Sequence, residues 1–408
     1  MKPWIKILLG LVLGIITGLV MGNQVIFFSD LIERVGKAFI DLLKMLVGLI
    51  VFSSLVVGMC HISDPKKLGR IGKRTIIFYS VTTLIAVAFG LILVFILKPG
   101  VDLGLPLPPT KGASAHISLM DFLFSIVPSN PFSAFTEGNI LQVIVFSVFF
   151  AFAITLSGKK GKVVLKYLES LSEVMYSLTH FIMKLAPYGV FALIATAVSS
   201  VGIKVILPLL KFLACNYIAC FLQIIFVFGF SLRYLAKLKV APFFKGMKDA
   251  IILAFTTSSS SATLPVSLEC ARDHLGLSPD ISGFVLSLGS TINMNGGAIG
   301  QAVSAIFIAQ AYGIEVTVAK VCILVFVSLV SAVGAAGIPG TGIVMLSVVL
   351  NAMGLPLEGI ALVAGVDRLR EMVSSVVNIL GDAVAAVFVA KKEKQINLDR
   401  YHAVTWLE

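Results

Sequence analysis

Polar side chains near the end of the chain recur at intervals that place them on one face of a helix. Between Val366 and Val389 they are spaced by +4, +3, +1, +3 and +4 residues: Asp367, Glu371, Ser374, Ser375, Asn378 and Asp382. In an α-helix these positions form one stripe about 100° wide. Ionisable residues in an apolar span are costly unless paired or hydrated, so the stripe predicts a functional site, with carboxylates available to a cation. A buried ion-pair network that only fixes helix packing is the alternative.

Two further polar segments interrupt apolar sequence. One is Ala250 to Ala271, with TTSSSSATLP and its helix-breaking Pro265 at the middle; the other is Val318 to Leu350, with GAAGIPGTG at the middle. Lipid cannot satisfy free N–H and C=O groups, so non-helical backbone at membrane depth is buried in protein or lines a wet cavity. The segments therefore predict two broken hairpins whose tips face the internal polar site of a transporter. Alternatively, these small polar residues only support helix packing.

Between the two segments lies GSTINMNGGAIGQ, from Gly289 to Gln301. Asn293 and Asn295 flank Met294 and two glycines follow, a pattern that predicts an unwound helix with amide and carbonyl oxygens turned inward. Hard monovalent and alkaline-earth cations prefer such neutral oxygens together with a carboxylate. The stripe near the end of the chain would supply the carboxylates.

The elements that must position these residues are membrane helices. Of 408 residues, 58% are hydrophobic and 13% are charged, a composition outside the range of soluble globular domains. An all-α polytopic membrane protein with the lipid bilayer as its surroundings is predicted. Its candidate spans include Ile7 to Met21, Ala38 to Met59, Thr75 to Leu97, Leu141 to Leu156, Val174 to Ala197 and Val205 to Leu232. The first is expected to be a retained span, because a small-residue cleavage site is missing.

Basic residues set the predicted orientation. They cluster at 66–74, 159–166, 233–248 and 391–394, whereas the alternate loops carry few. By the positive-inside rule both termini are cytoplasmic, in a multi-pass plasma membrane protein such as one of a bacterial inner membrane. The net charge of +11 then needs no nucleic-acid partner, because the charges are dispersed among short loops. The five cysteines show no metal-binding spacing and are expected to be packing residues.

No linker precedes the polar half that begins near residue 245, so one membrane domain over residues 1–408 is predicted. In order along the chain, SSSATLP, TINMNGG, GIPGTG, VDRLREM and NILGD resemble the motifs of the glutamate transporter family, the dicarboxylate/amino acid:cation symporters. The resemblance extends over nearly the whole chain. It implies eight transmembrane helices and two re-entrant hairpins in a homotrimer, with an elevator-type alternating-access mechanism.

The same resemblance divides the chain into a static and a moving part. Scaffold helices would lie within residues 1–60 and 117–200, and the transport part would comprise 75–97 and 204–393. The re-entrant hairpins would cover about 242–275 and 317–353, and residues 394–408 would form a cytoplasmic tail.

For the substrate, the resemblance implies that the first hairpin tip and Asn378 hold an α-carboxylate, that Glu371 meets an α-ammonium group, and that the second tip is the extracellular gate. The residues that it assigns to substrate binding are Ser259, Ser260, Ser261, Gly297, Ile338, Gly340, Gly342, Asp367, Glu371, Ser374, Ser375 and Asn378.

Sodium ions would be carried together with the substrate. The resemblance implies one site formed by Asn293, Asn378, Asp382 and the carbonyl of Gly289. A second would use carbonyls of Thr291 and of the second tip, with Met294 close by. A third would use Tyr79, Thr82, Thr83, Asn293 and Asn295.

Three positions depart from the family pattern. Asn295 stands where the family usually has aspartate, which weakens the third cation site. Gly297 replaces a hydroxyl or another small side chain. Ser374 stands where members that carry acidic substrates have an arginine, and a substrate carboxylate buried there without a cation would be costly. These departures favour sodium-coupled symport of a small neutral amino acid.

The closest alternative is a symporter of an acidic amino acid or a dicarboxylate, coupled to sodium or protons, that uses Arg370 or Arg368. Both arginines are expected near the extracellular end, where snorkelling is easy, and the head of Arg370 is expected one turn nearer the outer mouth than Ser374. A passive channel would not accumulate substrate against a gradient. An intramembrane serine hydrolase would need a base beside the serine run, and His61, His180 and His274 lack that setting, so no enzyme is predicted.

Overall fold

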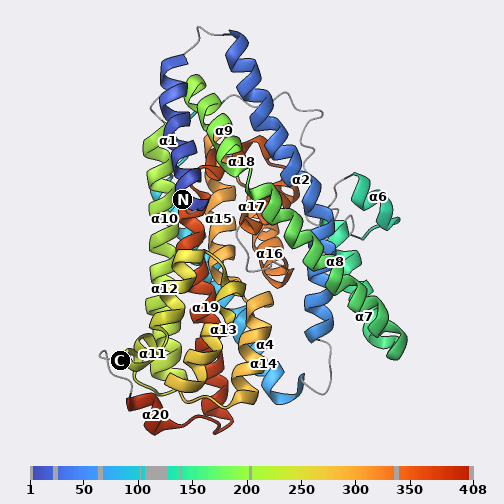
Figure 1. The fold of residues 1–408 in the computed structure, drawn as a ribbon, viewed down its shortest axis with the longest axis vertical. Coiled ribbons are helices and arrows are strands. Elements are labelled where there is room, and N and C mark those ends of the chain that lie inside the picture. The colour runs from blue at the N-terminus through green and yellow to red at the C-terminus, as the bar shows by residue number, and fades with distance from the viewer. Residues whose placement is uncertain are drawn as a thin grey trace.

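A computed structural model describes residues 3–21, 26–62, 68–101, 103–105, 127–137, 140–201, 205–334 and 340–403. Within these ranges the protein is helical, and the only strand-like pairing is an isolated antiparallel bridge between Leu277 and Ile396. Figure 1 shows an elongated bundle in which most long helices run along the long axis. This agrees with the predicted all-α class, whereas the number of membrane spans and the trimer remain predictions.

The N-terminal helices form one group. α1 (Pro3–Met21) packs along α9 (Ala186–Val201), and α2 (Ile26–Ile62) packs against α7 (Ile140–Leu156), α8 (Lys159–Met183) and α9. The short helix α6 (Pro131–Thr136) contacts α7. Gly10, Gly14 and Gly18 of α1 approach α9 so closely that a Cβ atom at any of them would collide with an α9 carbonyl oxygen. Small residues four apart allow this close packing of membrane helices.

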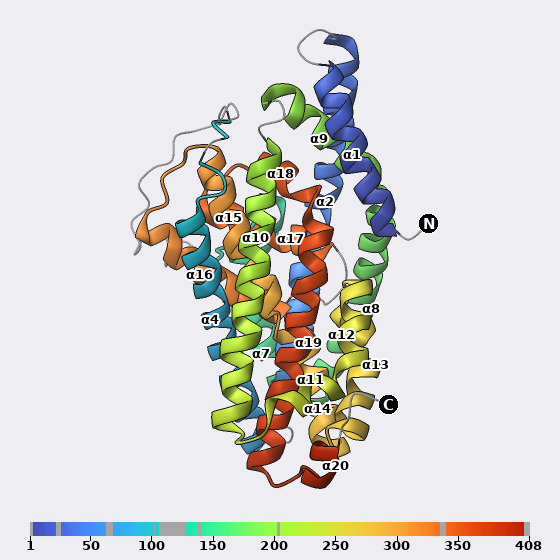
Figure 2. The ribbon, with the colours of Figure 1, turned by 90° about the vertical axis from the view of Figure 1, so that its left-hand side faces the viewer.

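The C-terminal helices form a second group around α15 (Asn295–Ala311) and α19 (Asp367–Lys392). α15 is almost completely buried against α4 (Lys73–Leu97) and α19, and α14 (Pro279–Ile292) packs on α19 as well. α10 (Ile206–Leu222) contacts α4, α15 and α19. Figure 2 shows α19 and α10 side by side along the length of this group. Short helical segments complete it: η2 (Leu68–Gly72), η4 (Gln223–Phe228), η5 (Ser231–Leu235), η7 (Leu357–Gly359) and α18 (Ile360–Ala364).

Two groups of helices occupy the segments predicted as hairpins. The first comprises α11 (Val240–Gly246), α12 (Lys248–Thr257), α13 (Ser260–Glu269) and η6 (Cys270–His274). The second comprises α16 (Val318–Gly334) and α17 (Thr341–Met353). Ser258 lies between α12 and α13 in a left-handed conformation (φ 53°), and the chain reverses there. Gly340 precedes α17 with φ 90°. α12, α13 and α17 all contact α19, so the tip of the first hairpin and the start of α17 lie near the polar stripe.

Two predicted elements differ from expectation at a proline. Pro265 lies inside α13, and the break occurs at Ser258 and Ser259 because the Ser259 side chain accepts a hydrogen bond from the Ala262 N–H (3.1 Å) and caps the new helix. The predicted single span from Val174 to Ala197 is instead divided, because α8 ends at Met183 and α9 begins at Ala186. Pro187 has no N–H to bond to the preceding turn and is best accepted in the first turn of a new helix.

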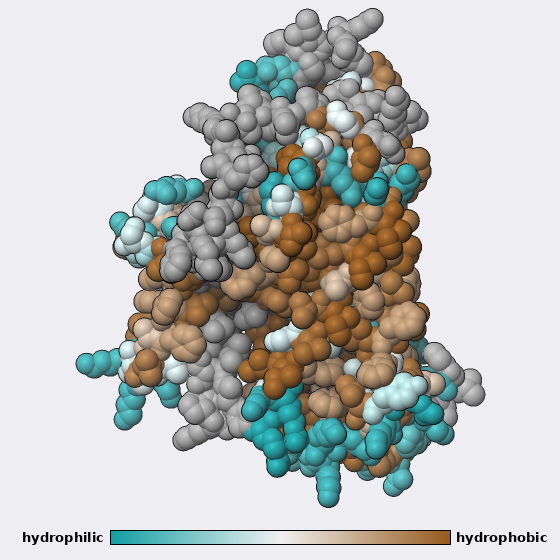
Figure 3. All heavy atoms as spheres, turned by 180° about the vertical axis from the view of Figure 1, so that it is seen from behind, coloured by the Kyte–Doolittle hydropathy of each residue, from teal (hydrophilic) through white to brown (hydrophobic). Residues whose placement is uncertain are grey.

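Four described helical stretches are long and apolar enough to cross a membrane: Arg70–Leu97, Ile206–Leu235, Pro279–Ala311 and Asp367–Lys392. Figure 3 shows apolar side chains across the middle of the molecule and hydrophilic side chains above and below them. On the α10–η4 helix, Phe221, Ile225 and Phe226 keep 53%, 61% and 60% of their surface exposed, which fits contact with lipid.

The end of the described chain folds back on the base of the first hairpin. α20 (Leu398–Ala403) contacts α11 and η6. The N–H of Asn397 donates to the Gly276 carbonyl oxygen (2.8 Å), and the fully buried Tyr401 donates through its hydroxyl to the Lys239 carbonyl oxygen (2.8 Å). At the end of α19, Glu393 accepts hydrogen bonds from Arg70 and Arg74. These contacts join α4, α19 and the first hairpin at one end of the bundle.

Candidate functional site

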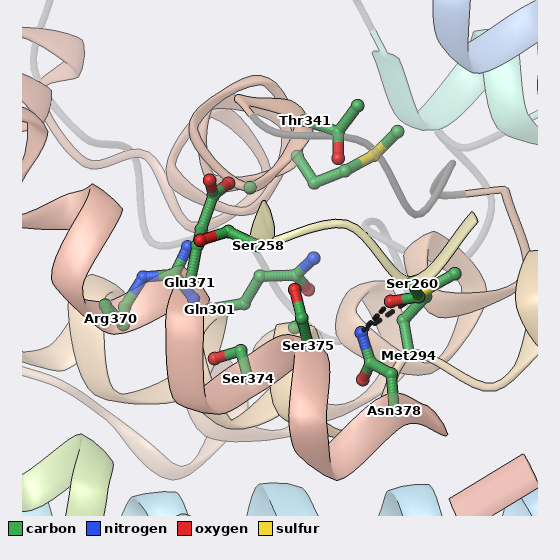
Figure 4. A pocket seen from close by; sticks show the side chains of 13 residues that line it. Ser258, Ser260, Met294, Gln301, Thr341, Arg370, Glu371, Ser374, Ser375 and Asn378 are labelled. Atoms are coloured by element: carbon green, nitrogen blue, oxygen red, sulfur yellow. Dashed lines mark hydrogen bonds between the residues drawn. The ribbon is translucent and has the colours of Figure 1, made fainter. Parts of the chain in front are cut away.

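A cavity of about 50 Å³ lies between the two hairpins, the α14–α15 junction and α19. Its lining consists of Ser258, Ser260, Met294, Gly297, Gln301, Thr341, Gly342, Met345, Arg370, Glu371, Ser374, Ser375 and Asn378. Figure 4 shows this lining from close by. Four segments that are far apart in the sequence therefore form one polar site.

Asn378 joins three of these segments. Its Nδ2 donates to Ser260 Oγ (3.3 Å) and to Met294 Sδ (3.2 Å), the two dashed bonds in Figure 4, and its Oδ1 accepts from the Gly296 N–H (2.8 Å). The junction between α14 and α15 is open because Asn293 (φ −121°, ψ 67°) and Met294 (φ −95°, ψ 58°) leave the helical conformation. This unwinding is what TINMNGG predicts.

The structure divides the predicted substrate residues into two groups. Those that line the cavity are Ser260, Gly297, Gly342, Glu371, Ser374, Ser375 and Asn378. Ser259 caps α13 instead, Ser261 lies half-buried outside the lining, and Asp367 pairs with Arg370. Gly340 donates its N–H to Glu371, and Ile338 lies outside the described residues.

Four lining residues were not predicted from the sequence. Ser258 begins the serine run, Gln301 follows Gly297 by one helical turn, and Thr341 precedes Gly342. Their closeness in sequence to predicted site residues is the signal that could have identified them. Met345 is one turn beyond Thr341, and an apolar residue in an apolar helix gives no such signal.

Four charged side chains of α19 lie together beside the cavity. Arg370 donates from Nε to Asp367 Oδ1 (2.7 Å), and its Nη2 lies 2.6 Å from the same oxygen. Both carboxylate oxygens of Glu371 accept the Gly340 N–H (3.1 and 3.2 Å), and Arg368 Nη1 lies 3.9 Å from Glu371 Oε2. Two cations face two anions, so the buried group carries its own neutralising charges.

Both arginines were expected at a place where snorkelling is easy, and in the structure their side chains are largely buried. The Arg370 side chain is 4% exposed, and Arg368 donates to the Thr257 carbonyl oxygen of the first hairpin (2.8 Å). Arg370 does lean toward the preceding turn, where it meets Asp367, but its head remains in the cavity lining, next to Gly300 and Gly342. A guanidinium therefore lies in the same cavity as Ser374.

A second polar cluster surrounds Asp382. The Asp382 Oδ1 accepts from Asn293 Nδ2 (2.8 Å), and both residues are buried. A Cβ atom on Gly289 would collide with the Asp382 carboxylate and lie 2.5 Å from the Tyr79 hydroxyl, so the three residues are in contact. Asn293 Oδ1 has no hydrogen-bond donor within the described part of the chain. An orphaned amide oxygen beside a buried carboxylate fits a hard cation.

The predicted residues of the third sodium site adjoin this cluster. Thr83 Oγ1 donates to Asn295 Oδ1 (2.6 Å), and Asn295 Nδ2 lies 3.3 Å from Thr82 Oγ1.

Thr291, assigned to the second sodium site, is exposed, and its hydroxyl donates to the Leu288 carbonyl oxygen (2.9 Å). Within the described ranges, no three His, Cys, Asp or Glu side chains could hold a metal ion together. The donor set is thus neutral oxygens with one carboxylate, which suits sodium better than a transition metal.

No histidine is among the described residues that line the cavity. His274 lies at the base of the first hairpin, with Nδ1 2.9 Å from the Gly246 carbonyl oxygen. The side chains placed around Ser258 and Ser260 therefore offer these serines an amide, a thioether and charged groups of α19, and no imidazole base.

The chain matches the Sodium:dicarboxylate symporter family over residues 4–392. It is 36% identical over 405 residues to the Proton/sodium-glutamate symport protein of Geobacillus stearothermophilus, covering 97% of this chain and 95% of the relative. It is 35% identical over 421 residues to the Proton/glutamate-aspartate symporter of Escherichia coli, covering 98% and 94%. It is 34% identical over 401 residues to the C4-dicarboxylate transport protein of Laribacter hongkongensis, covering 96% and 90%.

These findings correct the expected substrate. The preference for a neutral amino acid rested on Ser374, which stands in place of the family arginine. The three relatives are named for glutamate, for glutamate and aspartate, and for C4-dicarboxylates, and these are acidic compounds. The cavity also contains a guanidinium, that of Arg370, one turn before Ser374. A neutral substrate is therefore not supported, and the alternative of an acidic substrate is favoured.

Proposed function

Since the chain belongs to the sodium:dicarboxylate symporter family, we propose that it carries an acidic amino acid, aspartate or glutamate, across a membrane together with sodium ions or protons. It is then a secondary transporter and no enzyme. The names of the relatives support coupling to both kinds of cation.

One observation carries the choice of substrate: the guanidinium of Arg370 and the carboxylate of Glu371 line the same buried cavity. Nε and Nη2 of Arg370 face Asp367, which leaves Nη1 to bind the side-chain carboxylate of the substrate. The α-ammonium group would meet Glu371. The α-carboxylate would meet Ser260 and Asn378, whose side chains already lie 3.3 Å apart.

Cation coupling is proposed to act through the Asp382 cluster. A sodium ion there would be held by the carboxylate of Asp382 and the unpaired amide oxygen of Asn293. The cluster shares the α14–α15 junction with the substrate cavity, because Asn378 bonds to Met294 and Gly296 while Asn293 bonds to Asp382. Binding of the cation would therefore fix the junction that positions Asn378 for the substrate.

The larger-scale expectations are part of the same proposal. The chain would work as a homotrimer in a bacterial inner membrane with both termini in the cytoplasm. Residues 75–97 and 204–393 would move as a transport part against a scaffold within 1–60 and 117–200, and the second hairpin would be the gate. Packing of α2 against α16 and α17 supports a boundary at which the two parts meet.

A C4-dicarboxylate is the second candidate substrate. Glu371 already accepts the Gly340 N–H with both oxygens, so its charge is stabilised without a substrate ammonium group. A dicarboxylate could then occupy the space between Arg370 and Asn378, and relatives named for C4-dicarboxylates support this reading.

Uptake into proteoliposomes tests the proposal. The purified protein is reconstituted, and competition by aspartate, glutamate, succinate and serine is measured under an inward sodium gradient and under a proton gradient. Aspartate or glutamate should compete best, whereas strongest competition by succinate would select the second candidate. Strongest competition by serine would contradict an acidic substrate.

The guanidinium is tested in the same assay. Arg370→Ala should raise the KM for aspartate by about 30-fold or more, because truncating one partner of a buried charge pair costs about 2–5 kcal/mol. Arg368→Ala is the comparison, since Arg368 binds the Thr257 carbonyl oxygen and lies outside the lining. Equal KM values for Arg370→Ala and the parent would remove Arg370 from the substrate site.

A further inference from the structure

The guanidinium of Arg370 lies between two glycines from different helices. A Cβ atom on Gly300 of α15 would collide with Arg370 Nη1 and lie 2.8 Å from its Cζ. A Cβ atom on Gly342 of α17 would collide with Arg370 Nη2 and lie 3.0 Å from Glu371 Oε1. Real Cβ atoms are essentially never this close to a neighbour, so the buried arginine head occupies the space where two side chains would otherwise be.

Backbone conformation does not explain Gly300. It lies inside α15 and is absent from the described residues with positive φ, so any L-residue could adopt its conformation. Glycine within a helix is less stable than alanine by about 0.5–1 kcal/mol. Its neighbours Ala298, Ile299, Ala302 and Val303 have side chains and are fully buried. The guanidinium of Arg370 therefore occupies the space that a side chain at position 300 would need.

The next turn of the same contact is closed to an arginine head. On α15, Gly296 packs directly on the backbone of Ser374, because a Cβ atom at 296 would lie 2.5 Å from Ser374 Cα. Gly296 faces Ser374 and Gly300 faces Arg370, and the residues of each helix are four apart. α15 and α19 are therefore antiparallel where they touch. The backbones touch at Ser374, whereas at Arg370 they leave a slot that the guanidinium fills.

We propose that Gly300 is the positioning residue that sets the preference for acidic substrates, by holding open the slot for the Arg370 head. This inference rests on the proposed function, in which Arg370 binds the side-chain carboxylate. The other wall, Gly342, belongs to the second hairpin, so the slot is complete only while that hairpin lies against α19. A side chain at position 300 would push Nη1 out of the slot and away from the position that a substrate carboxylate requires.

Gly300→Ala tests the slot in reconstituted full-length protein. The KM for aspartate should rise about 10- to 100-fold, the range for losing a charge-assisted contact, while the maximal uptake rate and the thermal midpoint stay at parent values. The fold should tolerate the change because the nearest atoms belong to the far end of a flexible side chain. Gly283→Ala in α14 is the matched control, since its Cβ atom would lie 3.7 Å from the guanidinium of Arg272, an ordinary contact.

A double-mutant cycle separates positioning from general packing. If Gly300 acts through Arg370, adding Gly300→Ala to Arg370→Ala should raise the KM for aspartate no further.

The results distinguish this inference from the proposed function. Three results would each contradict the positioning role of Gly300. They are an unchanged KM in Gly300→Ala, additive effects in the cycle, and a fall in maximal rate and thermal midpoint instead of a change in KM. The proposed function fails separately, if Arg370→Ala itself leaves the KM for aspartate at the parent value.

Discussion

Asp382 and Asn293 are the residues on which the cation chemistry depends most directly. The Asp382 carboxylate is 3% exposed and receives one hydrogen bond, from Asn293 Nδ2. A carboxylate with so few neutral donors and so little water is stabilised strongly by a bound cation, because the attraction is weakly screened in a buried site. The rest of the cluster consists of hydroxyl and amide groups, which bind a cation only as dipoles.

Asp382→Asn should reduce sodium-dependent uptake of aspartate by about 30-fold or more, the effect of removing one charge from a buried pair. The substitution keeps the shape of the side chain, so the protein should elute from a sizing column as the parent does. Radiolabelled uptake with and without a sodium gradient measures the effect. Parent-level sodium-dependent uptake in this variant would place the cation elsewhere.

Asn295→Asp should tighten the dependence on sodium. Asn295 is fully buried and bonds to Thr83 Oγ1 and Thr82 Oγ1, so a carboxylate there would add a formal charge next to two hydroxyl ligands. The sodium concentration that gives half-maximal uptake should fall several-fold, and the Hill slope should rise if a further ion binds. Sodium titration of flux in parent and variant decides the point, and identical curves would exclude position 295 as a cation ligand.

At the level of elements, the sequence predicted the positions of the breaks better than their causes. The serine run marked the first tip correctly, but Pro265 suggested the wrong breaking residue. Ser259 caps α13, which begins at Ser260, and Pro265 lies inside that helix. Asn293 and Met294 were correctly expected to unwind. The lining residues of α19 could be predicted because they share one helix face, whereas Ser260, Gly297 and Gly342 were predicted through the resemblance of their motifs.

The position of the Arg370 head could not be predicted from α19 alone. The lean of its side chain toward Asp367 follows from helix geometry, but the space that keeps it in the cavity is supplied by Gly300 and Gly342 on two other helices. Contacts between segments 70 and 28 residues apart leave no local pattern in the sequence. Ser374 consequently received too much weight as a determinant of the substrate.

Glu371→Asp should loosen the second hairpin. Both oxygens of Glu371 accept the Gly340 N–H at 3.1 and 3.2 Å, and a side chain shorter by one methylene, about 1.5 Å, cannot keep these distances. A thiol introduced by Thr341→Cys should then react faster with a maleimide in the absence of substrate. Cys322 is the exposed cysteine among the free ones, so Cys322→Ser provides the background. Equal labelling rates with Glu and Asp at 371 would show that the bonds between Glu371 and the Gly340 N–H do not hold the second hairpin.

On the scale of the whole molecule, α20 and the residues just before it stabilise one end of the bundle. Tyr401 is fully buried and bonds to the Lys239 carbonyl oxygen, and the Asn397 N–H bonds to the Gly276 carbonyl oxygen. Burial raises the pKa of the Tyr401 phenol, so it stays a neutral donor through the physiological range. The first hairpin, which supplies Ser258 and Ser260 to the cavity, is thereby held to the end of α19.

Ending the chain after Lys394 should lower the thermal midpoint of the detergent-purified protein relative to a chain that ends after Ala403. Tyr401→Ala should produce much of the same loss, because truncating a buried aromatic side chain costs about 3–5 kcal/mol. Tyr401→Phe should lose only about 0.5–1.5 kcal/mol with its one hydrogen bond. Equal midpoints for the two truncated chains would show that the fold-back contacts do not stabilise the protein.

The polar stripe of α19 also constrains how the protein is made. A charged residue near the centre of a helix raises the free energy of its entry into lipid by about 2.5–3.5 kcal/mol, and in α19 Asp382 lies near the centre, whereas Asp367, Arg368, Arg370 and Glu371 lie in the first two turns. The helix is long and apolar enough to cross a membrane, but its polar residues Asn378 and Asp382 form their hydrogen bonds with other segments. It leaves the ribosome after α14, α15 and both hairpins, whose buried polar groups are its partners. The polar groups of these earlier segments therefore gain their partners on α19 only after the last membrane helix has been made.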